Sequence, residues 1–348
     1  MNSNKEKALL VHVHLRDRRY RSDWPLEEVV EELRELARSS RLDIQDELTV
    51  QRDQPTPAFL IGKGKVEELQ IRCRQQGAGV IVFGHDLSFP QQRNLEELIG
   101  VKVIDRTQLI LDIFAQRARS KEGRVQVELA QLEYLLPRLA GKGIVLSRLG
   151  GGIGTRGPGE QKLEVDRRRV RHRIGRLDRE LEEIRQRRGI ARRKREKEAV
   201  PSVALVGYTN AGKSTLLNAL TRAQSTAEDR LFTTLDPLTR RLKLPDHQTV
   251  LVTDTVGFIH ELPPHLVDAF RATLEEVTES DLLLHVLDAS SPLSDHKASA
   301  VLEILRILGA EQKLTLLVLN KVDLVKPEAR KALARQTSEG TEFLWHVA

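Results

Sequence analysis

Cysteine and long apolar runs are the two features that this sequence lacks. A single thiol, Cys73, excludes an internal disulfide and is typical of proteins that work in a reducing cytoplasm. No apolar run approaches the roughly 18 residues that a membrane-spanning helix needs, and the run 8–15 is short and interrupted by histidines. These absences predict a soluble, cytoplasmic chain with neither a membrane span nor a secretory signal.

Metal-ligand patterns are missing as well. The ten histidines are scattered rather than paired at metal-ligand spacings, and no cysteine cluster exists, so no zinc site is expected. Cys73 falls in the segment 66–76, which has the spacing of an amphipathic helix and favours a buried thiol over a nucleophile. The chemistry of this chain is therefore expected from other residue types.

Length and charge indicate several domains and a charged partner. A chain of 348 residues is long enough for two or three domains. The net charge of +6 is unevenly distributed, because residues 162–198 contain sixteen Lys or Arg against eight Asp or Glu. Such a segment points to a polyanionic partner, and the solvated face of a basic helix is the equally weighted alternative.

A phosphate-binding motif, G-x-x-x-x-G-K-S, follows the strand-like run 203–206 and leads into a helical run, which is the context that the motif requires. Gly207 and Gly212 let backbone N–H groups face a phosphate at the positive end of the helix dipole. Lys213 is predicted to reach the β- and γ-phosphate oxygens, and Ser214 to bind Mg²⁺. The nucleotide-binding residues predicted in this loop are Gly207, Tyr208, Thr209, Asn210, Ala211, Gly212, Lys213, Ser214 and Thr215.

A second motif, N-K-x-D, ends the apolar strand-like run 314–319. Nucleotide sites lie at such carboxyl ends of strands in open α/β sheets. The Asp323 carboxylate only accepts hydrogen bonds, and guanine offers its N1–H and 2-amino donors side by side, which adenine does not. Asn320 is predicted to bond the N7 side of the base, and the stem of Lys321 to lie over it. The two motifs together predict GTP as the ligand.

Between these motifs an apolar run ends in D-x-x-G. Asp254 is predicted to hold Mg²⁺ through water, and the Gly257 N–H to meet the γ-phosphate. A switch threonine closes on Mg²⁺ only when a γ-phosphate is present. Thr233 and Thr234 are both candidates, and their spacing alone does not choose between them.

Two expected features of a guanine-nucleotide domain are absent. Where small signalling GTPases carry a glutamine that orients the attacking water, this chain has Phe258, so slow intrinsic hydrolysis is expected and no catalytic residue is assigned. We expect a partner or another residue to position the water. After the strand-like run 342–348 the sequence stops where a backbone N–H is normally presented to guanine O6. Either Ala348 provides it or the last motif is missing, and weaker nucleotide affinity is expected.

Two apolar seams in the middle of the chain predict a pair of helices. Between them lies the segment 141–160, with eight of the 22 glycines. The economical arrangement is an antiparallel two-helix arm, whose second helix has about 25 residues, with this loop at its tip. The seam residues are Val125, Leu129, Leu132, Leu136 and Leu139 in the first helix, and Val170, Ile174, Leu177, Leu181 and Ile184 in the second.

The glycine-rich tip carries positive charge and almost no acid. Glycine lets the backbone approach a phosphate chain closely, so Lys142, Arg148 and Arg156 are predicted to contact RNA. A linker without function is the alternative. It is disfavoured because a linker has no need of arginine or of the apolar residues found in this loop.

Residues 1–118 alternate short β-runs with helices, which predicts a compact α/β module. The segment Ile61–Lys65 precedes a helix, so its amides and two lysines could bind a phosphate, but a tight turn with solvated lysines is the favoured interpretation. The expected strands are 8–15, 79–83 and 101–104, and the expected helices are 26–38, 66–76 and 91–99.

The order of α/β module, glycine-tipped arm and G domain resembles the HflX family of ribosome-associated GTPases over essentially the full chain. Gln161 stands where threonine is common in that family, and the relatives continue further at the C-terminus. The stretches that carry the resemblance are Ile61–Leu69, Asp105–Ala115, Gly151–Glu160 and Lys162–Arg169.

The resemblance implies binding to the large ribosomal subunit and its rRNA through the tip of the arm. It further implies that the GTP-bound protein dissociates stalled or idle ribosomes under stress, and that the ribosome stimulates hydrolysis. It suggests ATP hydrolysis linked to the N-terminal module, and it favours Thr234 as the switch threonine. The alternatives are a factor in large-subunit assembly and a protein-interaction switch whose arm docks another coiled coil without binding RNA.

The sequence therefore predicts an α/β protein, with a P-loop GTPase domain of mostly parallel sheet preceded by a small α/β domain and an antiparallel two-helix arm. The expected domains are 1–118, 119–198 with its tip loop at 141–160, and 199–348. GTP and Mg²⁺ are the expected cofactors. The Mg²⁺ ligands are expected to be Ser214, Thr234 and, through water, Asp254, and a monomer is expected.

Overall fold

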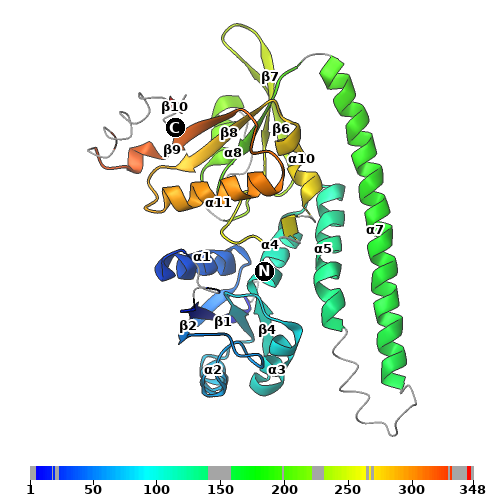
Figure 1. The fold of residues 1–348 in the computed structure, drawn as a ribbon, viewed down its shortest axis with the longest axis vertical. Helices are drawn as coiled ribbons and strands as arrows, with labels where there is room; N and C mark the ends of the chain where they lie inside the picture. The colour runs from blue at the N-terminus through cyan, green and yellow to red at the C-terminus, as the bar shows by residue number, and fades with distance from the viewer. Residues whose placement is uncertain are drawn as a thin grey trace. The chain divides into compact units, whose positions relative to one another are not determined.

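The structure is a computed structural model (Figure 1), and the part it describes is residues 5–17, 19, 23–139, 158–197, 200–221, 231–263, 266–267, 270–327, 330 and 343–345. By its internal contacts the chain divides into two compact units. The N-terminal unit comprises Met1–Gln116 and Glu128–Arg179, and the G unit comprises Arg117–Val127 and Glu180–Ala348. None of the helices in the described ranges combines the length and apolar character that crossing a bilayer requires.

The N-terminal unit contains a four-stranded parallel sheet in the order β2-β1-β3-β4. Helices α2 and α3 cover one face, and α1 and α4 lie on the other (Figure 1). The predicted helices and strands are present, and β2 and α4 are additions to them. The strands are β1 (Lys7–Leu15), β2 (Asp43–Arg52), β3 (Val80–Phe83) and β4 (Lys102–Asp105), and the helices are α1 (Leu26–Ser39), α2 (Lys63–Gln76), α3 (Phe89–Ile99) and α4 (Arg106–Arg117).

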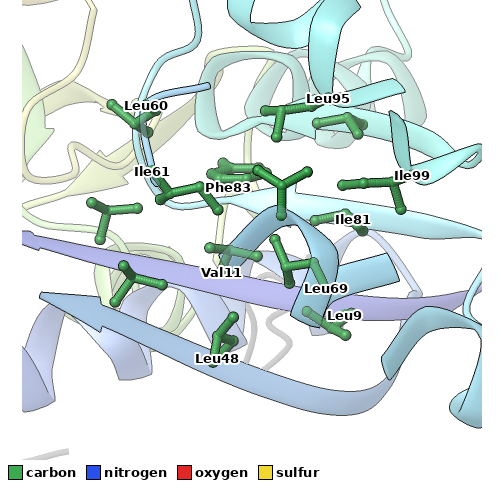
Figure 2. Close-up of a cluster of buried hydrophobic side chains, with 14 of the residues drawn as sticks. Leu9, Val11, Leu48, Leu60, Ile61, Leu69, Ile81, Phe83, Leu95 and Ile99 are labelled. Carbon is green, nitrogen blue, oxygen red and sulfur yellow. The ribbon is translucent and has the colours of Figure 1, made fainter. Parts of the chain in front are cut away.

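The central strand β1 is buried on both faces. Its odd-numbered residues, such as Leu9 and Val11, belong to the apolar cluster under α2 and α3 (Figure 2). Because side chains alternate across a strand, the even-numbered residues face the other helices. Cys73 on α2 belongs to the same cluster and is 3% exposed. Burial raises the pKa of its thiol to about 11, which agrees with the prediction of a buried, unreactive cysteine.

The arm consists of two helices, α5 (Lys121–Leu139) and α7 (Pro158–Lys197). The ion pairs Lys121–Glu180 at 2.7 Å and Glu128–Arg173 at 2.6 Å join them. Residues later in α5 pair with residues earlier in α7, so the two helices run antiparallel, as predicted. From the predicted seams, Val125 and Leu129 are buried, as are Leu177 and Leu181.

The second helix of the arm is longer than predicted. It has 40 residues rather than about 25, and it begins at Pro158, inside the segment 141–160 that was expected to be loop. Proline is favoured in the first turn of a helix because its missing N–H has no helical partner there. Beyond the apolar seam, the helix continues through a segment rich in Arg, Lys and Glu, residues of high helix propensity.

The G unit contains a six-stranded sheet in the order β10-β9-β8-β5-β7-β6, in which all neighbours are parallel except β6 and β7. This arrangement confirms the predicted fold class. The phosphate loop, Asp254 and Asn320 all follow or end parallel strands at the carboxyl edge of the sheet. The elements are β5 (Ser202–Val206), α8 (Lys213–Thr221), β6 (Leu238–Lys243), β7 (Thr249–Asp254), α10 (Arg271–Glu279), β8 (Leu282–Asp288), α11 (Ser294–Ile307), β9 (Thr315–Asn320), the 3-10 helix η1 (Val322–Leu324) and β10 (Phe343–Trp345).

Candidate nucleotide-binding site

The phosphate loop joins β5 to α8 and depends on two glycines. Gly207 has φ 155° and Gly212 has φ 95°, in the region that favours glycine. A Cβ atom on Gly207 would overlap the Val286 carbonyl oxygen, and one on Gly212 would overlap the amide of Asn320. The loop is therefore packed between the strand β8 and the guanine motif, and no larger residue fits at either position.

Lys213 begins α8 and is 6% exposed. Its Nζ donates to the carbonyl oxygens of Gly207 at 3.1 Å and Tyr208 at 2.9 Å, so the ammonium lies within the curve of the phosphate loop. Burial lowers the pKa of this lysine to about 8, and the nearby Asp254 carboxylate only partly opposes the shift. A phosphate in the loop would supply the negative charge that keeps this amine protonated.

Three oxygen-bearing side chains from three segments meet beside the loop. The Oδ2 atom of Asp254 accepts from Ser214 Oγ at 2.6 Å and from Thr234 Oγ1 at 2.9 Å, and the two hydroxyl oxygens are 3.0 Å apart. Asp254 is 1% exposed, and burial raises the pKa of its carboxyl. Its Oδ1 atom is buried without a hydrogen-bond partner among the described residues. The cluster therefore has unused acceptor capacity.

This cluster has the chemistry of a magnesium site. Mg²⁺ takes hard oxygen ligands, and the three groups gathered here are two hydroxyls and a carboxylate. A cation would also offset the cost of burying the Asp254 carboxylate and would use its unpaired oxygen. Ser214 and Thr234 are the side chains that would hold the ion, with Asp254 beside them, so the residues present fit the group.

The two candidate switch threonines have different surroundings. Thr234 bonds to both Ser214 and Asp254, whereas the described hydrogen bonds do not place Thr233 in that cluster. Phe232, which precedes Thr233, is buried, and its N–H donates to Thr209 Oγ1 at 3.0 Å. This bond attaches the switch segment, residues 231–237, to the phosphate loop. The pocket here is lined by Thr209, Asn210, Gly212, Lys213, Ser214, Thr215, Phe232, Thr233, Thr234, Thr255 and Gly257.

The D-x-x-G segment continues the same wall of the pocket. A Cβ atom on Gly257 would lie 2.7 Å from Thr209 Cα and 3.0 Å from Lys213 Nζ, so only glycine fits there. The side chain of Phe258 is fully buried, and its backbone bonds to both Gly207 and Thr209 in the phosphate loop. Phe258 thus holds the wall to the loop through its backbone, while its ring is packed away from the pocket.

The guanine motif is bound directly to the phosphate loop. Asn320 at the end of β9 donates from Nδ2 to the Ala211 carbonyl at 2.9 Å. Lys321 has φ 56°, and its Nζ pairs with Asp288 at 2.9 Å. Asp323 lies in η1 with its side chain exposed. An exposed carboxylate that follows a strand at the carboxyl edge of the sheet is open to a ligand's donors.

The structure brings the predicted nucleotide residues to one edge of one sheet, whereas the predicted RNA contacts Lys142, Arg148 and Arg156 lie outside the described residues. Sequence reasoning missed Asp288, which ends β8 and pairs with the motif lysine. Its place at the carboxyl end of a strand was the signal that could have found it. It also assigned no contact to Asp236, which lies two residues after Thr234 and accepts from the backbone N–H groups of Arg119 and Ser120.

Strand order, phosphate loop and the two guanine-nucleotide motifs together define a GTP-binding P-loop GTPase. Family models match in sequence order: "GTP-binding GTPase N-terminal" over residues 27–115, "GTP-binding GTPase Middle Region" over 117–195, and "50S ribosome-binding GTPase" over 202–321.

Similarity over most of the chain identifies the family. The chain is 52% identical to GTPase HflX of Caldanaerobacter subterraneus over 93% of this chain and 74% of that protein, and 46% identical to GTPase HflX of Escherichia coli over 92% and 74%. It therefore belongs to the HflX family of ribosome-associated GTPases, enzymes that bind and hydrolyse GTP.

The fold is also similar to solved structures. A complex of SsGBP with GDP matches with TM-score 0.55 and 25% identity, over 98% of this chain and 93% of that one. A GTP-binding protein of Sulfolobus solfataricus in complex with GDP matches with TM-score 0.51 and 25% identity, again over 98% and 93%. These likenesses cover both units rather than the G unit alone.

Replacing Asp323 with asparagine should change the preferred base. The carboxylate would no longer accept from both guanine donors, and the absence of these charged hydrogen bonds should weaken GTP binding by roughly 10- to 100-fold. Xanthine nucleotides, whose 2-oxo group accepts a hydrogen bond, should bind to the variant more tightly than to the parent chain. Titration with labelled, non-hydrolysable analogues of GTP and XTP measures both dissociation constants, and an unchanged guanine preference would contradict the role of Asp323.

Nucleotide binding should take up a proton above pH 8. The pKa of Lys213 is lowered to about 8 without phosphate. Phosphate charge should raise it again, so at pH 8.5 roughly half to one proton should be bound per nucleotide. Calorimetry in two buffers of different ionisation enthalpy counts that proton. At pH 6.5 the lysine is already charged, so it should contribute no proton uptake there. The same number of protons taken up per nucleotide at pH 6.5 and at pH 8.5 would refute the assignment.

Proposed function

We propose that this chain is a Mg²⁺-dependent GTP switch that binds the large ribosomal subunit through its N-terminal domains and promotes dissociation or rescue of stalled ribosomes in the cytoplasm. One observation carries the proposal: a nucleotide site with a closed oxygen cluster occurs in the same chain as a long basic helix. The first can report the nucleotide state, and the second can bind a polyanion. The proposed domains are 1–118, 119–198 and 199–348.

The proposed nucleotide contacts follow from the geometry of the G unit. The amides of the phosphate loop and Lys213 bind the phosphates, and Ser214, Thr234 and, through water, Asp254 hold Mg²⁺. Asn320 and Asp323 bind guanine. Thr234 is proposed as the switch threonine because its hydroxyl already lies within hydrogen-bond distance of the other two metal-site side chains.

Slow intrinsic hydrolysis is part of the proposal. Phe258 cannot orient water by hydrogen bonding, and its ring is fully buried. In related GTPases, a partner that completes the active site accelerates hydrolysis by roughly 10³- to 10⁵-fold. A partner that supplies this positioning would therefore control the lifetime of the GTP state. The ribosome fits that role, because it is also the polyanion that the arm would bind.

The basic helix α7 has two sets of arginines. One set pairs with acidic groups of neighbouring helices, as Arg173 does with Glu128 at 2.6 Å and Arg188 with Glu122 at 2.8 Å. The other set is exposed to solvent. A row of exposed arginines suits the phosphates of RNA, whose binding would release counterions and fall with added salt. The exposed arginines in the described part of the helix are Arg168, Arg169, Arg171, Arg176, Arg179 and Arg187.

Three other functions are less well supported. A role in large-subunit assembly would use the same RNA surface. A protein-interaction switch would need the arm to dock another helix, which its exposed arginines disfavour. The secondary ATPase activity stays a prediction from family resemblance, because Lys65 at the start of α2 pairs with Glu68 at 2.7 Å and no described contact favours a phosphate there.

Co-sedimentation with separated ribosomal subunits tests the proposal. We expect the chain to pellet with large subunits when a non-hydrolysable GTP analogue is present, at least tenfold more than with GDP, and only weakly with small subunits. Adding whole ribosomes should then yield free subunits if the function is rescue. Binding only to immature large subunits would favour assembly, and nuclease-resistant capture of a protein would favour the interaction switch.

Arg148→Ala combined with Arg156→Ala should weaken large-subunit binding and flatten its salt dependence. Removing one phosphate contact reduces the slope of log affinity against log salt by about one. GTP affinity should not change, because both residues lie outside the nucleotide motifs. Sedimentation across a salt series measures the slope, and Arg74→Ala on α2 serves as a control for the removal of a basic side chain elsewhere. An unaltered slope in the double variant would remove the tip from the RNA interface.

A further inference from the structure

A side chain of the switch segment holds the N-terminus of α5. The carboxylate of Asp236 accepts from the backbone N–H groups of Arg119 at 2.8 Å and Ser120 at 2.7 Å, and from the Ser120 hydroxyl at 2.5 Å. The Ser120 Oγ in turn accepts from the N–H of Gly123 at 2.8 Å. Amides at a helix N-terminus lack partners within the helix, and a carboxylate there is favoured by the helix dipole. Ser120 and Asp236 thus form one cap on α5, in which Ser120 accepts from the first turn and Asp236 holds Ser120 in place from a distant segment.

The close approach of this carboxylate depends on glycine in the first turn. Gly123 is buried, and a Cβ atom at this position would overlap Asp236 Oδ1. Glycine is a poor residue inside a helix, so its presence here disfavours α5 unless the contact compensates. The contact therefore depends on two residues: Asp236, which supplies the carboxylate, and Gly123, which leaves space for it.

Asp236 is mechanically tied to the metal-site cluster. Only Leu235, which is 2% exposed, separates it from Thr234, whose hydroxyl bonds to Asp254. Three consecutive residues are thus held by the oxygen cluster, the apolar core and the N-terminus of α5. All three contacts lie within the G unit. Withdrawal of the threonine from the cluster must move the two residues that follow it.

The helix turn that Asp236 caps is the base of the arm. Lys121 pairs with Glu180 of α7 at 2.7 Å, and Glu122 pairs with Arg188 of α7 at 2.8 Å. A change at this first turn therefore reaches both helices of the arm at the end that belongs to the G unit.

We propose that Asp236 couples the nucleotide state to the arm. With a triphosphate and Mg²⁺ bound, Thr234 stays in the oxygen cluster and Asp236 caps α5. With a diphosphate, the threonine leaves, the carboxylate is withdrawn and the first turn of α5 opens. This inference rests on the proposed Mg²⁺-dependent switch. Coupling is reciprocal, so a ligand that holds the base of the arm closed also favours the triphosphate.

Hydrogen exchange of the full-length chain tests the coupling without a ribosome. Peptides covering residues 117–124 report the base of α5, and peptides covering 207–215 report nucleotide binding. In the parent chain, the amides of Arg119, Ser120 and Gly123 should exchange roughly 5- to 30-fold faster with Mg-GDP than with a Mg-bound non-hydrolysable GTP analogue, the range expected when a helix cap is removed.

Two variants separate the contact from general stability. Asp236→Ala should give fast exchange at 117–124 in both nucleotide states while residues 207–215 stay protected. Gly123→Ala should also give fast exchange, although alanine is the better helix former, because its methyl group displaces Asp236. Asp246→Ala, an exposed aspartate between β6 and β7, is the matched control and should behave as the parent chain.

Each outcome is decisive. If Asp236→Ala keeps the nucleotide-dependent difference, or Gly123→Ala slows exchange, the cap does not transmit the switch. A parent chain that protects 207–215 but shows no difference at 117–124 likewise overturns the coupling and leaves GTP binding intact. If nucleotide fails to protect 207–215, the proposed switch falls and the coupling falls with it. Failure to bind ribosomal subunits would affect only the proposed function.

Discussion

The buried carboxylate of Asp254 is the constraint on which the nucleotide site depends. The carboxylate is 1% exposed, so the cost of burying its negative charge must be offset by neighbouring groups. These groups come from the phosphate loop, its helix and the switch segment, and they are Lys213, Ser214 and Thr234. Hydroxyl donors compensate a buried carboxylate less well than a cation does. The Lys213 ammonium supplies part of that compensation, and a divalent ion held by ligands from both segments would supply more. The buried carboxylate therefore suits a site that takes up a metal ion together with a phosphate.

The guanine motif and the phosphate loop are in direct contact. Asn320 bonds to the carbonyl of Ala211, and the absence of a side chain on Gly212 makes room for its amide. Lys321 is fixed by Asp288, which comes from the strand between β5 and β9. A phosphate that orders the loop therefore also orders the residue that follows the guanine strand. We therefore expect binding of the two ends of the nucleotide to be cooperative, because order at one end would be transmitted to the other through this contact.

Local patterns predicted the elements whose contacts are local. Strand–loop–helix context located the phosphate loop, and a short, mostly apolar β-run located β1. The sequence did not predict β2, because charged residues interrupt its alternation at the edge of the sheet, nor the full length of α7, because its apolar seam ends before the helix does. The cap by Asp236 joins residues 116 positions apart and leaves no periodic trace. Contacts of that kind depend on how segments meet in three dimensions, which single-sequence patterns do not encode.

Coupling through a helix cap has a consequence for the energy of the switch. A cap contributes about 0.5–2 kcal/mol, close to the coupling of about 1–3 kcal/mol that allosteric sites usually show. It is therefore large enough to bias the arm between two states, and small enough for the removal of one phosphate to reverse it. A buried ion pair in its place would lock the arm, because breaking such a pair costs about 3–5 kcal/mol. The half-buried, three-bonded carboxylate of a helix cap is thus the kind of contact that a reversible GTP switch requires.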